Sequence, residues 1–421
     1  MPISDKNTFK NILNRLCSHI EAQSDLLILL QAGMTALPAM SPDSGGEGEE
    51  AKALFIKEQI VRLGLPAAVD LNAPDSRVPC GYRPNFYTLL PGENKHITLW
   101  IAAHIDVVPP GDLSAWHSNP FELKVDGDFI YGRGVEDNQQ AVVTGLLALK
   151  AFVDEGVTPP CNLALLCLSD EETRNTYGAE YIAQNFPELF GPRDIMLVPD
   201  FGLPDASMLE VAEKGVLWLK FTVQGQQCHA STPQEGVNSL VAASELILRL
   251  ESLTEKFTAR NELFDPPVST FTPTMKEANV PNVNTMPGRD VFYMDCRILP
   301  ECSLNEVLQA VQLEVAALEA KRGVTVELEI VERREPAPVT DPEHFFLRAL
   351  QEAVQDIYGV LPQPQGIGGN TVSAYFRKMN IPCAVWARLV GNAHMPNERS
   401  CISWTLADAK VVCALALRLS E

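Results

Sequence analysis

Histidine and carboxylate side chains follow apolar stretches of this sequence, and their chemistry is that of metal ligands. His104 and Asp106 end the apolar run Ile97–Val108, just before two prolines. Side chains two residues apart on a strand share one face, and a metal-bound histidine commonly passes its second ring N–H to a carboxylate. A buried core histidine beside a turn-forming aspartate would have the same pattern, so this pair alone leaves both interpretations open.

Further strand ends, and one helix start at Asp137, supply more ligand-type side chains. In chain order they are Asp137 before the apolar segment 139–153, Glu171 and Glu172 after 161–169, Asp200 after 195–199, and His394 after 383–390. Buried strands that alternate with helices imply a doubly wound, mostly parallel sheet, which binds ligands beyond the carboxyl ends of its strands. Carboxylates that converge there are costly unless cations neutralise them. Mixed nitrogen and oxygen ligands suit zinc, with an open position for a hydrolytic water. The strand ends together therefore favour a metal site.

Periodicity predicts the elements that position these residues. The predicted helices are 7–33, 51–64, 139–153, 237–256, 303–321, 342–358 and 405–419, and the predicted strands are 85–90, 97–108, 161–169, 195–199, 216–223, 290–297, 324–331 and 383–390. The middle strands alternate apolar and polar residues, as in a sheet with one solvated face. We therefore predict an α/β catalytic domain built from residues 1–211 and 337–421, interrupted by an inserted α+β domain at 212–336.

Composition narrows the class of protein and its surroundings. The 421 residues, 46% of them hydrophobic, suffice for two domains with large cores. A formal net charge of −21 argues against nucleic acid or an anionic membrane as the main partner. The ten cysteines form no CxxC pair, which indicates a reducing compartment. The amino terminus has no apolar signal core, and Leu26–Leu30 is too short to span a bilayer. We therefore expect a cytoplasmic protein.

Nine short motifs resemble those of the di-zinc metallohydrolases that include succinyl-diaminopimelate desuccinylase, acetylornithine deacetylase, carboxypeptidase G and bacterial dipeptidases. They are HIDVVPPG, YGRGVEDNQQ, LSDEET, VPD, HAS, NVNTMPG, MDCR, GGNT and NAHMPNE, in the family's order. The resemblance covers the chain from about residue 25 to its end. It implies a catalytic domain interrupted by a lid domain that also dimerises, and therefore a homodimer.

The resemblance also implies a role for each ligand-type residue. His104 and Asp200 would hold one ion, Glu172 and His394 the other, Asp137 would bridge both, Asp106 would orient His104, and Glu171 would be the general base. Two close ions lower the pKa of a shared water and polarise the scissile carbonyl. A carboxylate that binds no metal must still carry the proton to the leaving nitrogen. We expect two divalent ions per chain, with zinc ahead of cobalt or manganese.

The inserted domain and a late glycine-rich loop would complete the site. By the same resemblance, His229 would stabilise the oxyanion from across the dimer. Asn284 and Arg297 would bind the polar end of the substrate, and Gly369 and Thr371 would face a carboxylate. The simpler interpretations are a turn residue for Asn284 and a surface ion pair for Arg297.

The predicted activity is metal-dependent hydrolysis of an amide bond in an N-acyl amino acid, with desuccinylation ahead of deacetylation. A dipeptidase of the same family is the alternative, because position 200 is Asp, as often in the family's dipeptidases, whereas desuccinylases usually have Glu there. A binding protein without catalysis would lack a ligand or Glu171, and this sequence keeps both.

Overall fold

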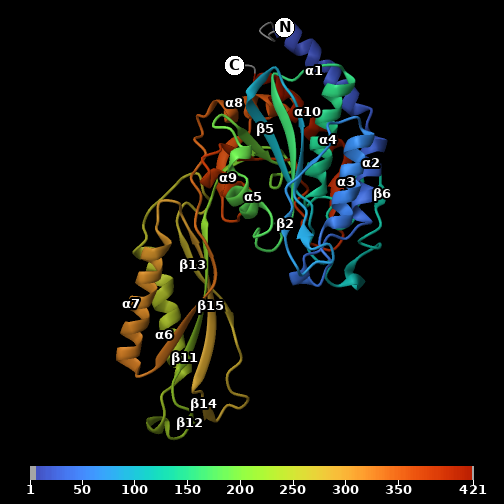
Figure 1. Ribbon diagram of the computed structural model, residues 1–421. Coiled ribbons are helices and arrows are strands. Elements are labelled where there is room, and N and C mark those ends of the chain that lie inside the picture. The colour runs from blue at the N-terminus through green and yellow to red at the C-terminus, as the bar shows by residue number, and fades with distance from the viewer. Residues whose placement is uncertain (1–5, 420–421) are drawn as a thin grey trace. The chain divides into compact units, whose positions relative to one another are not determined.

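The computed structural model describes residues 6–419, which form two compact units (Figure 1). The first unit comprises the described residues up to Val211, together with Thr340–Gln365 and the chain from Thr371. The second unit comprises Ala212–Val339 and Gly366–Asn370. Along the sequence, the second unit therefore interrupts the first.

The first unit contains an eight-stranded sheet in the order β1-β4-β8-β5-β9-β18-β10-β17. The central strands β8, β5, β9 and β18 are parallel, whereas β1, β4 and β10 pair antiparallel with their neighbours. The strands are β1 Val69–Asp70, β4 Phe86–Leu90, β5 Asn94–His104, β8 Cys161–Leu168, β9 Ile195–Val198, β10 Met208–Glu213, β17 Gln363–Ile367 and β18 Cys383–Val385. The predicted fold class, α/β with a mostly parallel sheet, is confirmed.

Helices cover both faces of this sheet. They are α1 Lys6–Glu21, α2 Ser24–Thr35, α3 Glu50–Arg62, α4 Gln139–Asp154, α5 Ala179–Asn185, α8 Phe345–Tyr358, α9 Ser373–Lys378 and α10 Ile402–Arg418. Helices α5 and α9 share one apolar cluster with β5, β8 and β9, and α4 packs on β5 and β8 beside α10. Gly145 allows α4 to approach closely, because an added Cβ would lie 2.7 Å from the Leu165 side chain. Every residue of β8 is accordingly buried.

Three predicted elements differ clearly from the structure. The strand predicted at 97–108 begins at Asn94 and ends at His104, because the N–H of Val107 bonds to the Ala39 carbonyl, outside the sheet. The single helix predicted at 7–33 is two helices, α1 and α2, because the chain turns at Ala22 and Gln23, whose N–H groups bond to carbonyls only three residues back. The strand predicted at 383–390 ends at Val385. Beyond it, side-chain carboxylates instead of a neighbouring strand accept the backbone N–H groups of Arg388 and Val390.

The second unit is a four-stranded antiparallel sheet with two helices on it. Its strand order is β13-β15-β11-β16. Alternate residues of β11, from Leu217 to Val223, join the core formed with the helices. Its elements are β11 Gly215–Gln224, β12 Cys228–His229, α6 Ser239–Glu251, β13 Thr270–Lys276, β14 Thr285–Met286, β15 Arg289–Ile298, α7 Leu304–Arg322 and β16 Thr325–Arg334. The predicted roles of this unit in closure and dimerisation stay predictions.

Short strands complete the first unit: β2 Ala73–Pro74, β3 Tyr82–Arg83, β6 Lys124–Asp126, β7 Phe129–Tyr131 and β19 Arg399–Cys401. Between residues 6 and 419, no helix combines the length and the apolar character needed to cross a bilayer.

Candidate metal centre

Three neighbouring parallel strands deliver most of the candidate ligands to one edge of the large sheet. His104 is the last residue of β5 and pairs with Leu168, the last residue of β8. The acidic pair Glu171–Glu172 follows β8, and Asp200 follows β9, which is the other parallel neighbour of β5. Because parallel strands end at the same edge, these side chains meet there.

The Asp137 carboxylate lies between the two histidines. Its Oδ1 is 2.8 Å from His104 Nε2, and its Oδ2 is 3.1 Å from His394 Nε2. Asp200 Oδ1 lies 3.4 Å from His104 Nε2, and Glu172 Oε2 lies 2.9 Å from His394 Nε2. The Nε2 atom of each histidine therefore faces one oxygen of Asp137 and one further carboxylate.

Asp106 orients two parts of this cluster at once. Its fully buried carboxylate accepts the backbone N–H of Glu171 on Oδ1 and that of Glu172 on Oδ2, both at 3.1 Å. His104 Nδ1 lies 3.1 Å from the Asp106 carbonyl oxygen and 3.5 Å from its Oδ1. Asp106 thus holds both the His104 ring and the backbone of Glu171 and Glu172 in place, while Nε2 of His104 faces Asp137.

The carboxylates repel one another in a buried setting. Burial raises the pKa of Glu172 to about 7, and it also raises the pKa values of Glu171 and Asp200. The hydrogen bond to Asp137 raises the pKa of His394 to about 10. The pKa of His104 lies well above its usual value, because the neighbouring carboxylates, Asp200 foremost, outweigh the effect of burial. So many acidic groups at one buried place call for cations.

The donor set fits divalent metal ions. One ligand atom each from His104, Asp137 and Glu172 lie within 4.8 Å of one another. Two buried oxygens, Glu172 Oε1 and Asp200 Oδ1, have no hydrogen-bond donor in the structure. Buried carboxylate oxygens are costly without a donor or a cation, so these lone pairs are available to a metal.

His229 and Asn284 lie in the second unit, on the paired segments around β12 and β14. The N–H of Ser231 donates to His229 Nδ1 at 3.1 Å. Because Nδ1 is an acceptor, the proton of the neutral ring sits on Nε2, which is then a hydrogen-bond donor. The backbone carbonyl of Asn284 accepts the N–H of Ala230, and its side-chain oxygen accepts from Asn282.

Arg297 also lies in the second unit, where its guanidinium donates to Asp295 and to the carbonyl of Gly368 at 2.8 Å. That contact ties it to the glycine-rich loop that contains Gly369. Thr371 belongs to the first unit, is buried, and accepts the N–H of Ser373 at the start of α9. The predicted roles of these residues in substrate binding stay predictions.

Two buried glutamates beside the centre were missed at the sequence level. They are Glu136, directly before Asp137, and Glu398, four residues after His394. Both lie inside motifs that were recognised, YGRGVEDNQQ and NAHMPNE, and a charged residue next to a ligand was the available signal.

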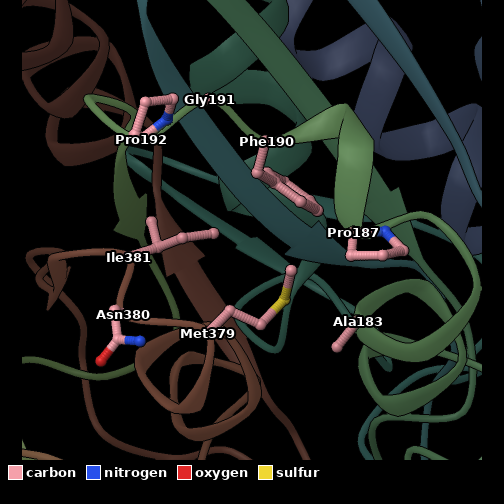
Figure 2. A pocket seen from close by; sticks show the side chains of 8 residues that line it. All are labelled: Ala183, Pro187, Phe190, Gly191, Pro192, Met379, Asn380 and Ile381. Carbon is pink, nitrogen blue, oxygen red and sulfur yellow. The ribbon is translucent and has the colours of Figure 1, made fainter.

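A separate cavity of about 540 Å³ contains none of the candidate residues, and Figure 2 shows its mainly apolar lining, which includes Phe190 and Met379.

Comparisons with known proteins identify the family of this chain. Residues 100–418 match the model of Peptidase family M20/M25/M40. An uncharacterized metallohydrolase of Methanococcus maripaludis is 34% identical over 409 residues, which cover 92% of this chain and 97% of the relative. A succinyl-diaminopimelate desuccinylase of Sulfurovum sp. is 27% identical over 324 residues, covering 76% of this chain and 83% of that protein.

Solved structures share the fold. A metallo-carboxypeptidase of family M20 from Sulfolobus solfataricus aligns with a TM-score of 0.75 at 21% identity, covering 94% of this chain and 99% of that one. The dipeptidase Dug1p from Saccharomyces cerevisiae aligns with a TM-score of 0.75 at 17% identity, covering 100% and 99%. The chain therefore belongs to peptidase family M20/M25/M40, and it is a metallohydrolase that acts on amide or peptide bonds.

Proposed function

We propose that the protein hydrolyses an amide bond of an N-acyl amino acid with two divalent ions, zinc first among them. His104 and Asp200 would hold one ion, and Glu172 and His394 the other. Asp137 would be shared, and the observation that carries the proposal is the division of its two oxygens between the two histidines, at 2.8 and 3.1 Å. When bound, such ions activate a water and polarise the scissile carbonyl.

Glu171 is the proposed general base. It binds neither histidine, and the Asp106 carboxylate holds its backbone N–H at 3.1 Å, beside the ligand Glu172. Burial raises the pKa of Glu171, and a base with a raised pKa accepts a proton more readily and returns it to the leaving nitrogen. The adjacent glutamates thus divide the work between proton transfer and metal binding.

The second unit would supply groups for the substrate. His229, with its proton on Nε2, is suited to donate to a developing oxyanion, and the family resemblance has it act from the second copy of a homodimer. Asn284, Arg297 and the loop with Gly369 and Thr371 would bind the polar end of the substrate. Within residues 6–419, none of the ten cysteines forms a disulfide, which supports a cytoplasmic location.

Succinylated substrates are favoured because relatives named desuccinylases align over most of this chain, one of them at 27% identity. A dipeptidase is the second candidate, because Asp200 occupies a position that is often Asp in the family's dipeptidases. These substrates differ at one end: a desuccinylase must recognise an acyl carboxylate, whereas a dipeptidase must recognise a free α-amine.

A substrate panel tests the proposal. Metal-free protein is loaded with zinc, cobalt or manganese and assayed on N-succinyl amino acids, N-acetyl amino acids and dipeptides. We expect hydrolysis of the succinylated compounds at the highest kcat/KM. Turnover of dipeptides alone would establish the alternative, and a fully metal-loaded protein that cleaves none of the three classes would contradict both.

A further inference from the structure

The buried carboxylate of Glu398 holds the backbone that leads into Asp137. Its Oε1 accepts the N–H groups of Glu136 and Asp137 at 2.9 and 3.0 Å. Its Oε2 accepts the N–H of Gly134 at 3.0 Å and Arg133 Nη1 at 2.6 Å. All four donors therefore come from residues 133–137, while the acceptor belongs to the loop that carries the second histidine.

Glu136 makes the reverse connection. Its Oε2 accepts the N–H of Val390 at 2.6 Å, and its Oε1 accepts those of Gly391 and Asn392 at 2.9 and 2.8 Å. These three residues lead directly into His394. Each of the two loops therefore inserts a carboxylate into the backbone donors of the other, and hydrogen bonds to an ionised acceptor are the stronger kind.

The loop of His394 has other contacts beyond that residue: Asn397 Oδ1 accepts the N–H of His117 at 2.7 Å, and β19 pairs with β7 from Arg399 onward. The strand before it, β18, ends at Val385, so a sheet ladder does not reach this segment. The His394 side chain is 56% exposed, whereas that of His104 is 2% exposed. Arg133 adds one bond to the His394 carbonyl at 3.3 Å. On the side that enters His394, Glu136 accepts the backbone N–H groups of all three residues 390–392, so the position of this histidine depends on the exchange between Glu136 and Glu398.

We propose that Glu136 and Glu398 are positioning residues that together set the separation between Asp137 and His394. Through that separation they set the affinity of the ion held by Asp137, Glu172 and His394. The inference rests on the proposed two-metal function. It predicts an unequal effect. The ion of His394 depends on both loops, whereas the ion of His104 and Asp200 shares only Asp137 with them and otherwise depends on strand ends and on Asp106.

Glu136→Gln and Glu398→Gln test the inference. Whichever way the new amide turns, its NH2 group meets backbone N–H donors, so part of the loop connection is lost. Removing a group that orients a ligand typically costs 10–100-fold in metal affinity. We expect each variant to bind the ion of His394 about 10–100-fold more weakly, and the ion of His104 with a clearly smaller loss, by calorimetric titration of metal-free protein with zinc.

Asp194→Asn is the matched control. Asp194 is also buried and accepts three donors: the N–H groups of Thr98 and Gly191, and Trp100 Nε1. It directly precedes β9, at the end of that strand opposite Asp200. The control is expected to lower the melting temperature without changing either metal affinity. His394→Ala identifies the affected ion, because it removes the ligand outright.

The outcomes separate the inference from the function on which it rests. A parent protein that binds no ion would refute both. A parent with two ions, and variants that bind both ions as tightly as Asp194→Asn does, would refute the positioning role alone. If the glutamine variants fail to fold, Glu136→Asp and Glu398→Asp keep the charge but shorten its reach, and unchanged affinity for both ions in these variants would overturn the inference.

Discussion

The two halves of the metal centre differ in what holds their histidines. His104 ends a buried strand between two parallel neighbours, and the Asp106 carbonyl and carboxylate fix its ring. His394 lies on a loop, with a side chain that is 56% exposed and a backbone tied down by Glu136. The difference is between a ligand positioned by the sheet and a ligand positioned by side-chain carboxylates.

The two histidines should therefore differ in how far a single substitution nearby displaces them. A strand end is fixed by many backbone hydrogen bonds and by core burial, so loss of one polar contact leaves it in place. A loop fixed by a few charge-assisted bonds loses its geometry when one carboxylate is altered. We therefore expect substitutions around His394 to act selectively on one ion, and the following predictions test that contrast from the largest effect to the smallest.

Glu171→Gln should abolish most activity while leaving both halves of the metal centre intact. The amide cannot take a proton from water, and loss of a general base typically lowers kcat about 10²–10⁴-fold. Metal content by elemental analysis should stay at the parental value. Glu172→Gln is the neighbouring control and should lose the ion that Glu172 and His394 would hold. Parental turnover by Glu171→Gln would assign the proton transfer to another group.

His229→Ala should lower kcat about 10²–10³-fold, because it removes a donor to the oxyanion, and it should leave both metal affinities unchanged. Its location in the family's dimer can be tested by mixing it with Glu171→Ala. Random exchange makes half of the dimers mixed, each with one complete site, so about a quarter of parental activity should return. A mixture shown by mass spectrometry to contain mixed dimers, yet inactive, would contradict action across the dimer.

Asp106→Asn should affect both ions, unlike Glu136→Gln, because Asp106 holds the ring of His104 and also the backbone of Glu171 and Glu172. We expect losses of about 10-fold or more in the affinity of each ion. Zinc titration followed by calorimetry measures both affinities in one experiment. An effect confined to the ion of Glu172 and His394 would show that the two halves are positioned in the same way.

In metal-free protein, the pH dependence of stability should report the titration of Glu172 and His394. Burial raises the pKa of Glu172 from 4.5 to about 7, and the hydrogen bond to Asp137 raises that of His394 from 6.5 to about 10. Both groups bind protons more tightly in the folded chain, so their contribution is complete below pH 4.5 and is lost as pH rises toward 10.

The melting temperature in a chelator should therefore fall from about pH 5 to pH 9. The increase on adding zinc should grow over the same range, because the ion replaces the bound protons. Glu172→Gln with His394→Ala should make the metal-free profile less steep without flattening it, because the raised pKa values of His104, Glu171 and Asp200 remain. A melting temperature that rises with pH in the parent would contradict the assigned shifts.

The half of the candidate centre at the strand ends could be predicted from sequence, because the apolar runs identify the strands and the residues directly after them are the candidate ligands. Continuous apolar runs identified β5, β8 and β9, and parallel strands bring the residues after them to one edge. The joint appearance of His104, Glu171, Glu172 and Asp200 followed from that rule. The break between α1 and α2 did not, because neither glycine nor proline marks the turn at Ala22 and Gln23.

The position of the loop that carries His394 was harder to predict from sequence. Nothing in the pattern of residues 386–398 indicates that their N–H groups are satisfied by a glutamate more than 250 residues earlier in the chain. The same apolar composition therefore predicted a strand that extends to residue 390. Motif matching found His394, but the partners that hold it, Glu136 and Glu398, emerge only when the two loops are seen together.

The number of metal ions per chain tests the central claim most directly. Metal-free protein is titrated with zinc, freed of excess ion, and analysed for zinc and protein together with His394→Ala. A centre in which Asp137 faces a histidine with each oxygen predicts two ions in the parent and one in the variant. One ion or none in the parent, or two in the variant, would contradict the account.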